Sequence, residues 1–127
     1  MKRLNGRRAL GERGERLAAR FLVSQGYTIH ETNVRFTVGE IDLIAWEKAT
    51  LCFVEVRSAS STDWGGPLAS VTDQKRHRLI RAARWYLNRL RTLPEEIRFD
   101  VVAIQWQAAQ SPLIEVVKGA FDAEGEW

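Results

Sequence analysis

The stretch that decides the fold reads Gly-Glu-Ile-Asp-Leu-Ile-Ala-Trp at residues 39–46 and Thr-Leu-Cys-Phe-Val-Glu-Val-Arg at residues 50–57. Both segments are rich in β-branched and aromatic residues, which are enriched in β-strands. The short polar stretch 47–49 separates them, as the turn of a hairpin would. The sequence therefore predicts two antiparallel strands joined by a short turn.

Two acidic side chains are predicted to meet in this hairpin. Side chains alternate along a strand, so Asp42 shares a face with Ile44, and Glu55 shares a face with Phe53. A turn centred on residues 48–49 pairs Ile44 with Phe53 and, two residues further on, Asp42 with Glu55. Directly opposed like charges have Cβ atoms about 5 Å apart and destabilise a sheet unless a positive charge lies between them.

Two explanations account for such a pair of acids. A divalent cation can lie between them, because Mg²⁺ binds one or two carboxylates, keeps several waters and takes substrate phosphate as a further ligand. Alternatively, Asp42 and Glu55 lie on a solvated face of the sheet or form ion pairs with Arg57 and basic residues further along the chain. The same register places Glu40 opposite Arg57. The residues alone leave both explanations open.

Helices and further strands are predicted on both sides of the hairpin. Apolar residues recur at helical spacing over 7–25, and Gly26 follows at the position of a left-handed cap. A second helix begins near Thr72, continues to about Arg91 and stops before Pro94. Further strands are predicted at 27–36, 98–106 and 113–118, and a loop at 58–70. This αβββαββ order predicts an α/β fold with a mixed central sheet flanked by helices.

The composition is that of one soluble globular domain. A chain of 127 residues is long enough for one hydrophobic core and too short for two, so residues 1–127 are predicted to form a single domain. No apolar run approaches the roughly 20 residues that span a bilayer, and the basic start lacks the apolar core of a secretion signal. The single cysteine, Cys52, cannot form an internal disulfide. These features predict a cytoplasmic protein with no membrane partner.

Basic residues are concentrated in the second predicted helix. The net charge is only +3, but residues 75–91 contain no acid and hold Lys75, Arg76, Arg78, Arg81, Arg84, Arg89 and Arg91. A surface of one sign is what phosphate contact requires, although such a run is also common on a solvated helix face. We expect a nucleic-acid partner, with phosphate contacts from Gln74, Lys75 and Arg78.

Tryptophans are candidates for contact with bases. Trp64, beside Gly65, either stacks on an unpaired base or closes over the core. The other tryptophans considered are predicted to be core residues, namely Trp46, Trp85 and Trp106.

A third carboxylate, Glu15, borders the apolar stripe of the first helix. At about 100° per residue it projects within roughly 20° of Leu22, so it can face the sheet, with a structural or solvated role as the alternative. Gly11 and Gly14 each cost roughly 1 kcal/mol relative to alanine inside a helix. They indicate either fraying or the close approach of a neighbouring element.

Several motifs together resemble a known family. Gly14–Glu15, Gly39–Ile44 and Phe53–Arg57 are similar to the motifs of the YraN-like family of uncharacterised bacterial proteins. This family is related to archaeal Holliday-junction resolvases within the PD-(D/E)XK, restriction-endonuclease-like superfamily. The resemblance extends through Val71–Thr72, 75–79, 98–103 and 118–121, so it covers nearly the whole chain. The order and spacing of the motifs are specific, whereas each motif alone is weak.

The resemblance implies a restriction-endonuclease-like αβββαβ core and a metal site. It implies that Asp42 and Glu55 bind Mg²⁺ or Mn²⁺, that the carbonyl of Val56 completes the coordination, and that Glu15 supports the site. The superfamily lysine is Arg57 here, although arginine also occurs at this position among YraN-like proteins. Arginine stays protonated and cannot act as a general base, but it can hold a phosphate and stabilise developing charge.

These observations leave three functions to test. The first is a Mg²⁺- or Mn²⁺-dependent endonuclease acting on nucleic acid, DNA more than RNA and branched or single-stranded DNA included, with Glu15, Asp42, Glu55 and Arg57 as catalytic residues. The second, motivated by Arg57, is a nucleic-acid-binding module of the same fold without turnover. The third is a protein-interaction subunit whose basic helix meets an acidic partner. Because junction-cutting relatives work as dimers, the resemblance also makes a homodimer an assembly to test.

Overall fold

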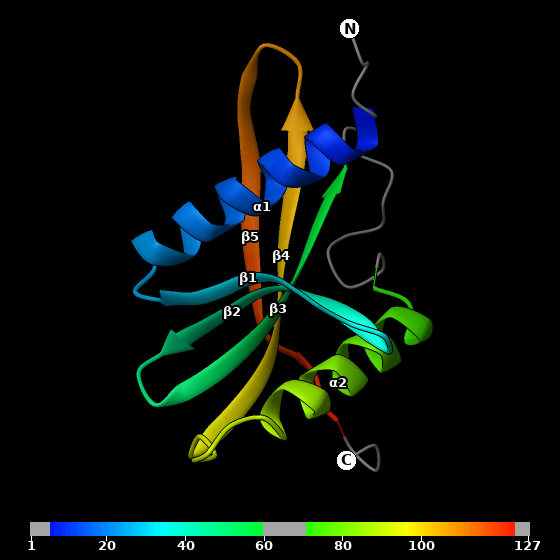
Figure 1. Cartoon of the computed structure of the whole chain (residues 1–127). Coiled ribbons are helices and arrows are strands. Elements are labelled where there is room, and N and C mark those ends of the chain that lie inside the picture. Colours follow the sequence, from blue (N-terminus) through cyan, green and yellow to red (C-terminus); the bar gives the residue numbers. More distant parts are fainter. Residues whose placement is uncertain (1–5, 60–70, 124–127) are drawn as a thin grey trace, which may run out of the picture.

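Five strands and two helices make up the computed structural model, which describes residues 6–59 and 71–123 (Figure 1). The elements are α1 (Gly6–Ser24), β1 (Thr28–Phe36), β2 (Gly39–Glu47), β3 (Thr50–Ala59), α2 (Asp73–Leu87), β4 (Glu96–Gln107) and β5 (Gln110–Phe121). The strands form one sheet in the order β1-β2-β3-β4-β5. Only β3 and β4 pair in parallel. The predicted αβββαββ order and the mixed sheet flanked by helices are therefore confirmed.

The sheet has a hydrophobic core on each face. Leu43 and Val54 pack with Ala18 and Leu22 of α1, and their chain neighbours Ile44 and Phe53 pack against α2. Because neighbouring residues along a strand point to opposite faces, the two helices cover opposite faces of the sheet. The residues that α2 buries are Leu79, Ile80, Ala82, Ala83 and Tyr86. Neither described helix has the length and apolar character needed to cross a bilayer.

The second helix begins where the sequence predicts and ends earlier. The hydroxyl of Thr72 caps its start by accepting a hydrogen bond from the backbone N–H of Lys75 at 3.2 Å. The helix ends at Leu87, before the predicted end near Arg91. There the N–H of Arg89 bonds to the carbonyl of Tyr86, and Leu90 bonds in the same way to Leu87. These i to i−3 bonds form a tighter last turn, which the apolar spacing alone does not distinguish from helix.

The predicted register of the hairpin is confirmed where the two strands pair. Ile44 pairs with Phe53 and Trp46 pairs with Leu51, and the pairing of β2 with β3 ends at Leu43 and Val54. The residues of β2 that come before Leu43 therefore lie beyond the ladder, where β3 no longer fixes their orientation.

The alternation of β2 breaks at Asp42. Ile41 packs into the same core as Ile44, whereas Glu40 lies with Leu43 along a cavity beside α1. Strict alternation would put Glu40 on the face of Ile44 instead. The Glu40–Arg57 pair expected from the hairpin is replaced by an ion pair between Glu40 and Arg35 of β1, with Nε and Oε2 3.2 Å apart.

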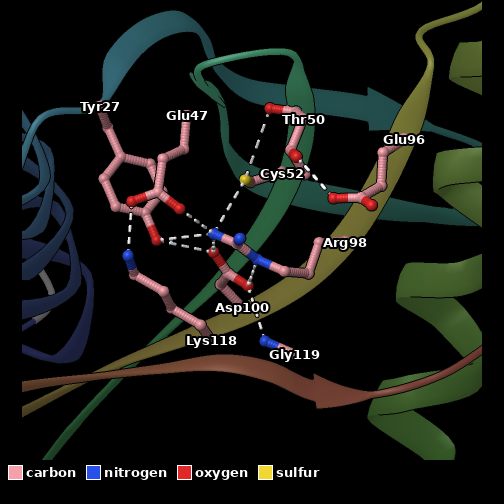
Figure 2. Close-up of polar contacts among 9 residues, drawn as sticks. All are labelled: Tyr27, Glu47, Thr50, Cys52, Glu96, Arg98, Asp100, Lys118 and Gly119. Atoms are coloured by element: carbon pink, nitrogen blue, oxygen red, sulfur yellow. Dashed lines mark hydrogen bonds and ion pairs between the residues drawn. The ribbon is translucent and has the colours of Figure 1, made fainter.

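A buried carboxylate connects the strands at the other end of β2 and β3 (Figure 2). The side chain of Asp100 is fully buried. It accepts hydrogen bonds from Tyr27 Oη at 2.8 Å, from Nε and Nη2 of Arg98 at 2.8 Å each, and from the backbone N–H of Gly119 at 2.9 Å. Burial raises the pKa of Asp100, but the hydrogen bonds from Arg98, Gly119 and Tyr27 outweigh it and hold that pKa below its usual range.

Arg98 extends this network to the hairpin. Its Nη2 donates to Glu47 of β2 at 2.9 Å and approaches Cys52 Sγ of β3 at 3.4 Å. Glu47 also pairs with Lys118 of β5. Burial raises the pKa of the Cys52 thiol to about 12, so this cysteine is an inert member of the core. The network therefore connects β2, β3, β4 and β5, together with Tyr27, which precedes β1.

Replacing Asp100 by alanine is expected to lower the free energy of unfolding by roughly 3 to 5 kcal/mol, because Arg98 loses its buried partner. An aspartate whose pKa is lowered by folding adds stability above its unfolded pKa and loses that contribution as the pH falls through its folded pKa. The difference between wild type and variant should therefore shrink in acid. Urea unfolding measures both effects, with the exposed Glu115→Ala as control. A loss under about 1 kcal/mol at neutral pH would contradict this assignment.

Gly39 sets how closely α2 approaches β2. A Cβ added to Gly39 would lie 2.7 Å from the backbone carbonyl oxygen of Arg78, an atom that cannot rotate away. We expect Gly39→Ala to destabilise the protein by about 1 to 3 kcal/mol through overpacking. Gly11→Ala is the matched control, since its Cβ would meet nothing within 4 Å and should stabilise α1 by up to about 1 kcal/mol. Thermal or urea unfolding of both variants checks the opposite signs.

Candidate functional site

A polar cavity of about 290 Å³ lies where β2 and β3 stop pairing, and residues of both helices line it. The acids that line it are Glu15 of α1, Glu40 and Asp42 of β2, and Glu55 of β3. The bases that line it are Arg57 of β3 and Lys75 and Arg78 of α2. Val56, predicted to offer its carbonyl, lines the same cavity. The structure thus brings together most of the site residues that the sequence singles out.

Asp42 and Glu55 interact directly. The backbone N–H of Val56 donates to Asp42 Oδ2 at 2.9 Å. Burial, followed by the charge of Glu55, raises the pKa of Asp42 to about 7, although the hydrogen bond from Val56 opposes the shift. Burial also raises the pKa of Glu55, although the charges of Arg57 and Lys75 oppose this effect. The two carboxyl groups lie close enough for each to shift the pKa of the other. The close pair predicted from the hairpin register is therefore present.

The basic residues approach the acids from β3 and α2. Arg57 Nη1 lies 3.6 Å from Glu55 Oε2. Within the described part of the chain, the buried Nε of Arg57 has no hydrogen-bond partner, so the surrounding groups do not use all the donors of this guanidinium. Burial lowers the pKa of Lys75, and the charge of Arg57 lowers it further, while Glu55 and Asp42 oppose the shift. The cavity therefore holds carboxylates together with cations, and one of these cations, Arg57, has a donor without a partner.

Glu15 is held by a residue that sequence reasoning missed. Burial and the charge of Asp42 raise the pKa of Glu15, and a hydrogen bond from Asn33 of β1 opposes this effect. Asn33 has φ 52°, in the left-handed region that few residues other than glycine adopt. The sequence carries a weak signal for it, because asparagine is depleted in strands and here stands in the middle of one. Asn33 and Glu15 also line the larger cavity of about 420 Å³ beside α1.

The residues predicted to contact nucleic acid are only partly brought together. Lys75 and Arg78 line the cavity, whereas Gln74 lies exposed at the start of α2 outside its lining. Trp64 lies outside the described residues.

The tryptophans differ in burial, and Gly14 lies next to β3. Trp46 and Trp106 pack against the two cores as predicted, but the prediction that Trp85 belongs to the core is wrong, since 40% of it is exposed. Helical spacing places Trp85 next to the apolar stripe without showing that the stripe ends there. A Cβ on Gly14 would lie in ordinary van der Waals contact with Ser58 Oγ, at 3.6 Å, so β3 lies next to α1 there, whereas a Cβ on Gly11 would meet nothing within 4 Å.

The donor set limits how a metal could be held. In the ranges 6–59 and 71–123, no three His, Cys, Asp or Glu side chains form a group that could hold a metal ion. Two carboxylates and a backbone carbonyl are nevertheless the oxygen donors that Mg²⁺ uses when waters and phosphate complete its shell. The donor set therefore fits a hydrated divalent ion and does not fit a site formed entirely by side chains.

Replacing Asp42 by asparagine should make stability less dependent on pH. A carboxyl whose pKa is raised by folding stabilises the protein at low pH and loses that contribution as the pH rises through about 7. We therefore expect Asp42→Asn to gain on the wild type between about pH 5 and about pH 8, by on the order of 1 to 4 kcal/mol. Urea unfolding in a chelator measures this, with Glu115→Gln as control. A difference that does not change with pH would argue against the close pair of acids.

Comparisons with known proteins identify the family of the chain. Residues 14–104 match the model of the "Uncharacterised protein family UPF0102". A UPF0102 protein of Desulfosudis oleivorans is 43% identical over 120 residues, which cover 94% of this chain and 95% of that one. A UPF0102 protein of Solibacter usitatus is 47% identical over 113 residues, which cover 87% and 84% of the two chains. The chain therefore belongs to family UPF0102, the YraN-like family that its motifs resemble.

Proposed function

We propose that this protein is a metal-dependent endonuclease that hydrolyses phosphodiester bonds in nucleic acid at the cavity around Asp42 and Glu55. The observation that carries the proposal is the mostly buried pair of carboxyl groups in a cavity open to a ligand, where burial raises the pKa of both and the charge of Glu55 raises that of Asp42. Such a pair is unfavourable in an apo protein and becomes favourable when a cation lies between the acids. The family-level resemblance to PD-(D/E)XK nucleases points to the same two residues.

Mg²⁺ or Mn²⁺ is the cofactor that these donors fit. Asp42 and Glu55 would hold the ion, and the carbonyl of Val56 would complete the protein ligands. The Val56 N–H already orients the Asp42 carboxylate by donating to one of its oxygens. When bound, such an ion acts as a Lewis acid toward a phosphate and lowers the pKa of a coordinated water.

The basic side chains around the two carboxyl groups can attract the negative charge of a phosphodiester. Arg57 has a buried Nε without a partner and an Nη1 that only loosely contacts Glu55, at 3.6 Å. A guanidinium with such free donors can hold a phosphate oxygen and stabilise the charge that develops on it. The superfamily has a lysine where this chain has Arg57. Lys75 reaches the same cavity from α2, so it can supply the primary amine that is missing at position 57. Arg78 extends the positive rim away from the acids.

Glu15 completes the proposed site as a third acid. It lies on the α1 side of the cavity, close enough for the charge of Asp42 to raise its pKa. Its hydrogen bond from Asn33 restrains its orientation. We assign Glu15 the role of orienting a water or a second ion next to the Asp42 and Glu55 pair, as an outer carboxylate does in many metal sites.

The basic residues at the edge of the cavity favour nucleic acid as the substrate class. The basic residues of α2 and of the turn after it continue from the cavity, and no acidic residue lies between residues 74 and 91. Contact with a phosphate backbone requires such a surface of positive charge. DNA is favoured over RNA, with branched or single-stranded DNA among the substrates to test, because the YraN-like family that the motifs resemble is related to junction resolvases. A homodimer is the assembly by which such relatives cut symmetric junctions.

Cleavage assays test the proposal directly. With Mn²⁺ or Mg²⁺, the wild type should cut at least one of single-stranded DNA, branched DNA, duplex DNA and RNA, and chelator should abolish the cut. Asp42→Asn and Glu55→Gln should each lower the rate by about 100-fold or more while the fold is retained. Arg57→Lys should keep activity, since it restores the superfamily residue. The exposed Glu115→Gln serves as the matched acid control.

Two results would reject the cavity around Asp42 and Glu55 as the catalytic metal site. Cleavage that survives Asp42→Ala would move the chemistry to another site. Calorimetric titration with Mn²⁺ should show binding that Asp42→Asn removes, and a wild type that binds no Mn²⁺ at millimolar concentration would exclude this metal site.

A non-catalytic nucleic-acid-binding module is the second candidate function. Arg57 favours it, because a guanidinium stays protonated and cannot take a proton from water. In that case the protein should bind nucleic acid with an affinity that falls steeply with salt, and no metal should produce cleavage. Binding without cleavage across Mg²⁺, Mn²⁺ and all substrates would select this function.

A further inference from the structure

An exposed surface that combines arginines with aromatic rings follows the candidate cavity along α2. It is formed by Arg78, Arg81, Trp85 and Arg89, together with Phe36 at the end of β1, and we call it the Trp85 surface. Its four residues from the α2 segment are exposed, and their spacing places them along one side of the helix and the turn that follows it. No acid lies between residues 74 and 91. The surface therefore carries positive charge around an exposed indole.

The indole of Trp85 is oriented by neighbours but not covered by them. Its ring meets Phe36 edge to face, with centroids 5.8 Å apart and an interplanar angle of 61°. The guanidinium of Arg89 lies 5.6 Å from the centroid of Phe36. An edge-to-face contact fixes the direction of a ring without stacking on it, and 40% of Trp85 remains exposed. The rings are thus pre-oriented, with indole surface available to a ligand.

The Trp85 surface is continuous with the candidate site. Arg78 lines the cavity that contains Asp42 and Glu55. Arg78 also lines a neighbouring cavity of about 430 Å³ formed with residues 35–40, one of which is Phe36. Glu40 is common to both cavities as well. A nucleic-acid strand that passes from the acids over Arg78 therefore next reaches Phe36, and then Trp85, whose ring contacts Phe36.

We propose that the Trp85 surface binds an unpaired base of the nucleic-acid strand whose phosphate occupies the candidate site. The inference rests on the proposed function and narrows its substrate to nucleic acid with a single-stranded segment beside the reacting phosphate. Aromatic rings bind unpaired bases by stacking, whatever the base, and flanking arginines hold the phosphates on either side. In a duplex the faces of the bases are already stacked, so only an unpaired strand can use this ring.

Binding in chelator, without turnover, tests the surface. Fluorescence anisotropy with a labelled single strand should show that Trp85→Ala binds about 5- to 150-fold more weakly than the wild type, the range expected for the loss of one stacked base. Trp85→Phe should retain most of the affinity because it keeps a ring. Duplex of the same sequence should lose less than about 2-fold, since its contacts are to phosphates. Leu113→Ala, at an exposed apolar residue of β5, is the matched control.

A series of strands with one base removed at a time separates stacking from charge. The wild type should lose affinity when the base is missing at one position, and Trp85→Ala should lose none at any position. Thermal unfolding of the variants establishes that they are folded. A folded Trp85→Ala that binds the single strand as the wild type does, or that weakens single strand and duplex equally, overturns the proposal, as does a wild type that binds no single strand.

The experiments distinguish failure of the Trp85 surface from failure of the endonuclease proposal. If the wild type uses Trp85 to bind single strands but no metal yields cleavage, the endonuclease proposal fails and the Trp85 surface stands. If cleavage depends on Asp42 while Trp85→Ala binds and cuts as the wild type does, the endonuclease proposal stands and the Trp85 surface fails.

Discussion

The buried ion pair between Asp100 and Arg98 is the interaction on which the arrangement of the strands depends. A carboxylate with no exposed surface is tolerable only when its oxygens are filled, and Asp100 receives bonds from Arg98, Tyr27 and Gly119. Because Arg98 also reaches Glu47, the same charge fixes where the β2–β3 hairpin lies relative to β4 and β5. Registers that separate these groups would leave a charge buried without a partner, so the network selects one pairing of the strands.

The two ends of the hairpin have opposite electrostatics. At Glu47 every acid of the network has a cation beside it, and folding lowers the pKa of Glu47. At Asp42 and Glu55, acids adjoin acids, and folding raises both pKa values. The satisfied end stabilises the sheet, which lets the strands hold an unfavourable pair at the open end. A pair of acids that lowers the stability of the folded protein, as Asp42 and Glu55 do, is typical of a ligand-binding site.

The sequence predicts the parts of this molecule that depend on local periodicity. The hairpin register follows from its turn, so Ile44 opposite Phe53 and the meeting of Asp42 with Glu55 could be worked out from spacing. The break in alternation at Asp42 could not, because it arises where the ladder with β3 ends.

Features that depend on distant segments were beyond the reach of the sequence. Tyr27 bonds to Asp100 from 73 positions away, and Asn33 supports Glu15 across two elements, which no pattern within one element encodes. Trp85 was misplaced for a related reason. Its neighbour Phe36 comes from β1, and helical spacing does not show how far the sheet extends beneath α2.

The contact between Gly39 and the backbone of Arg78 has a consequence for motion. The backbone of β2 at Gly39 contacts the backbone of α2 at Arg78, with no side chain of Gly39 between them. The spacing between β2 and α2 at this point is therefore set by peptide units, which are rigid. Salt and pH change ionic partners but leave such a contact unaltered. Adaptation to differently shaped ligands must then come from rotation of the long basic side chains, while the helix axis stays where the strand places it.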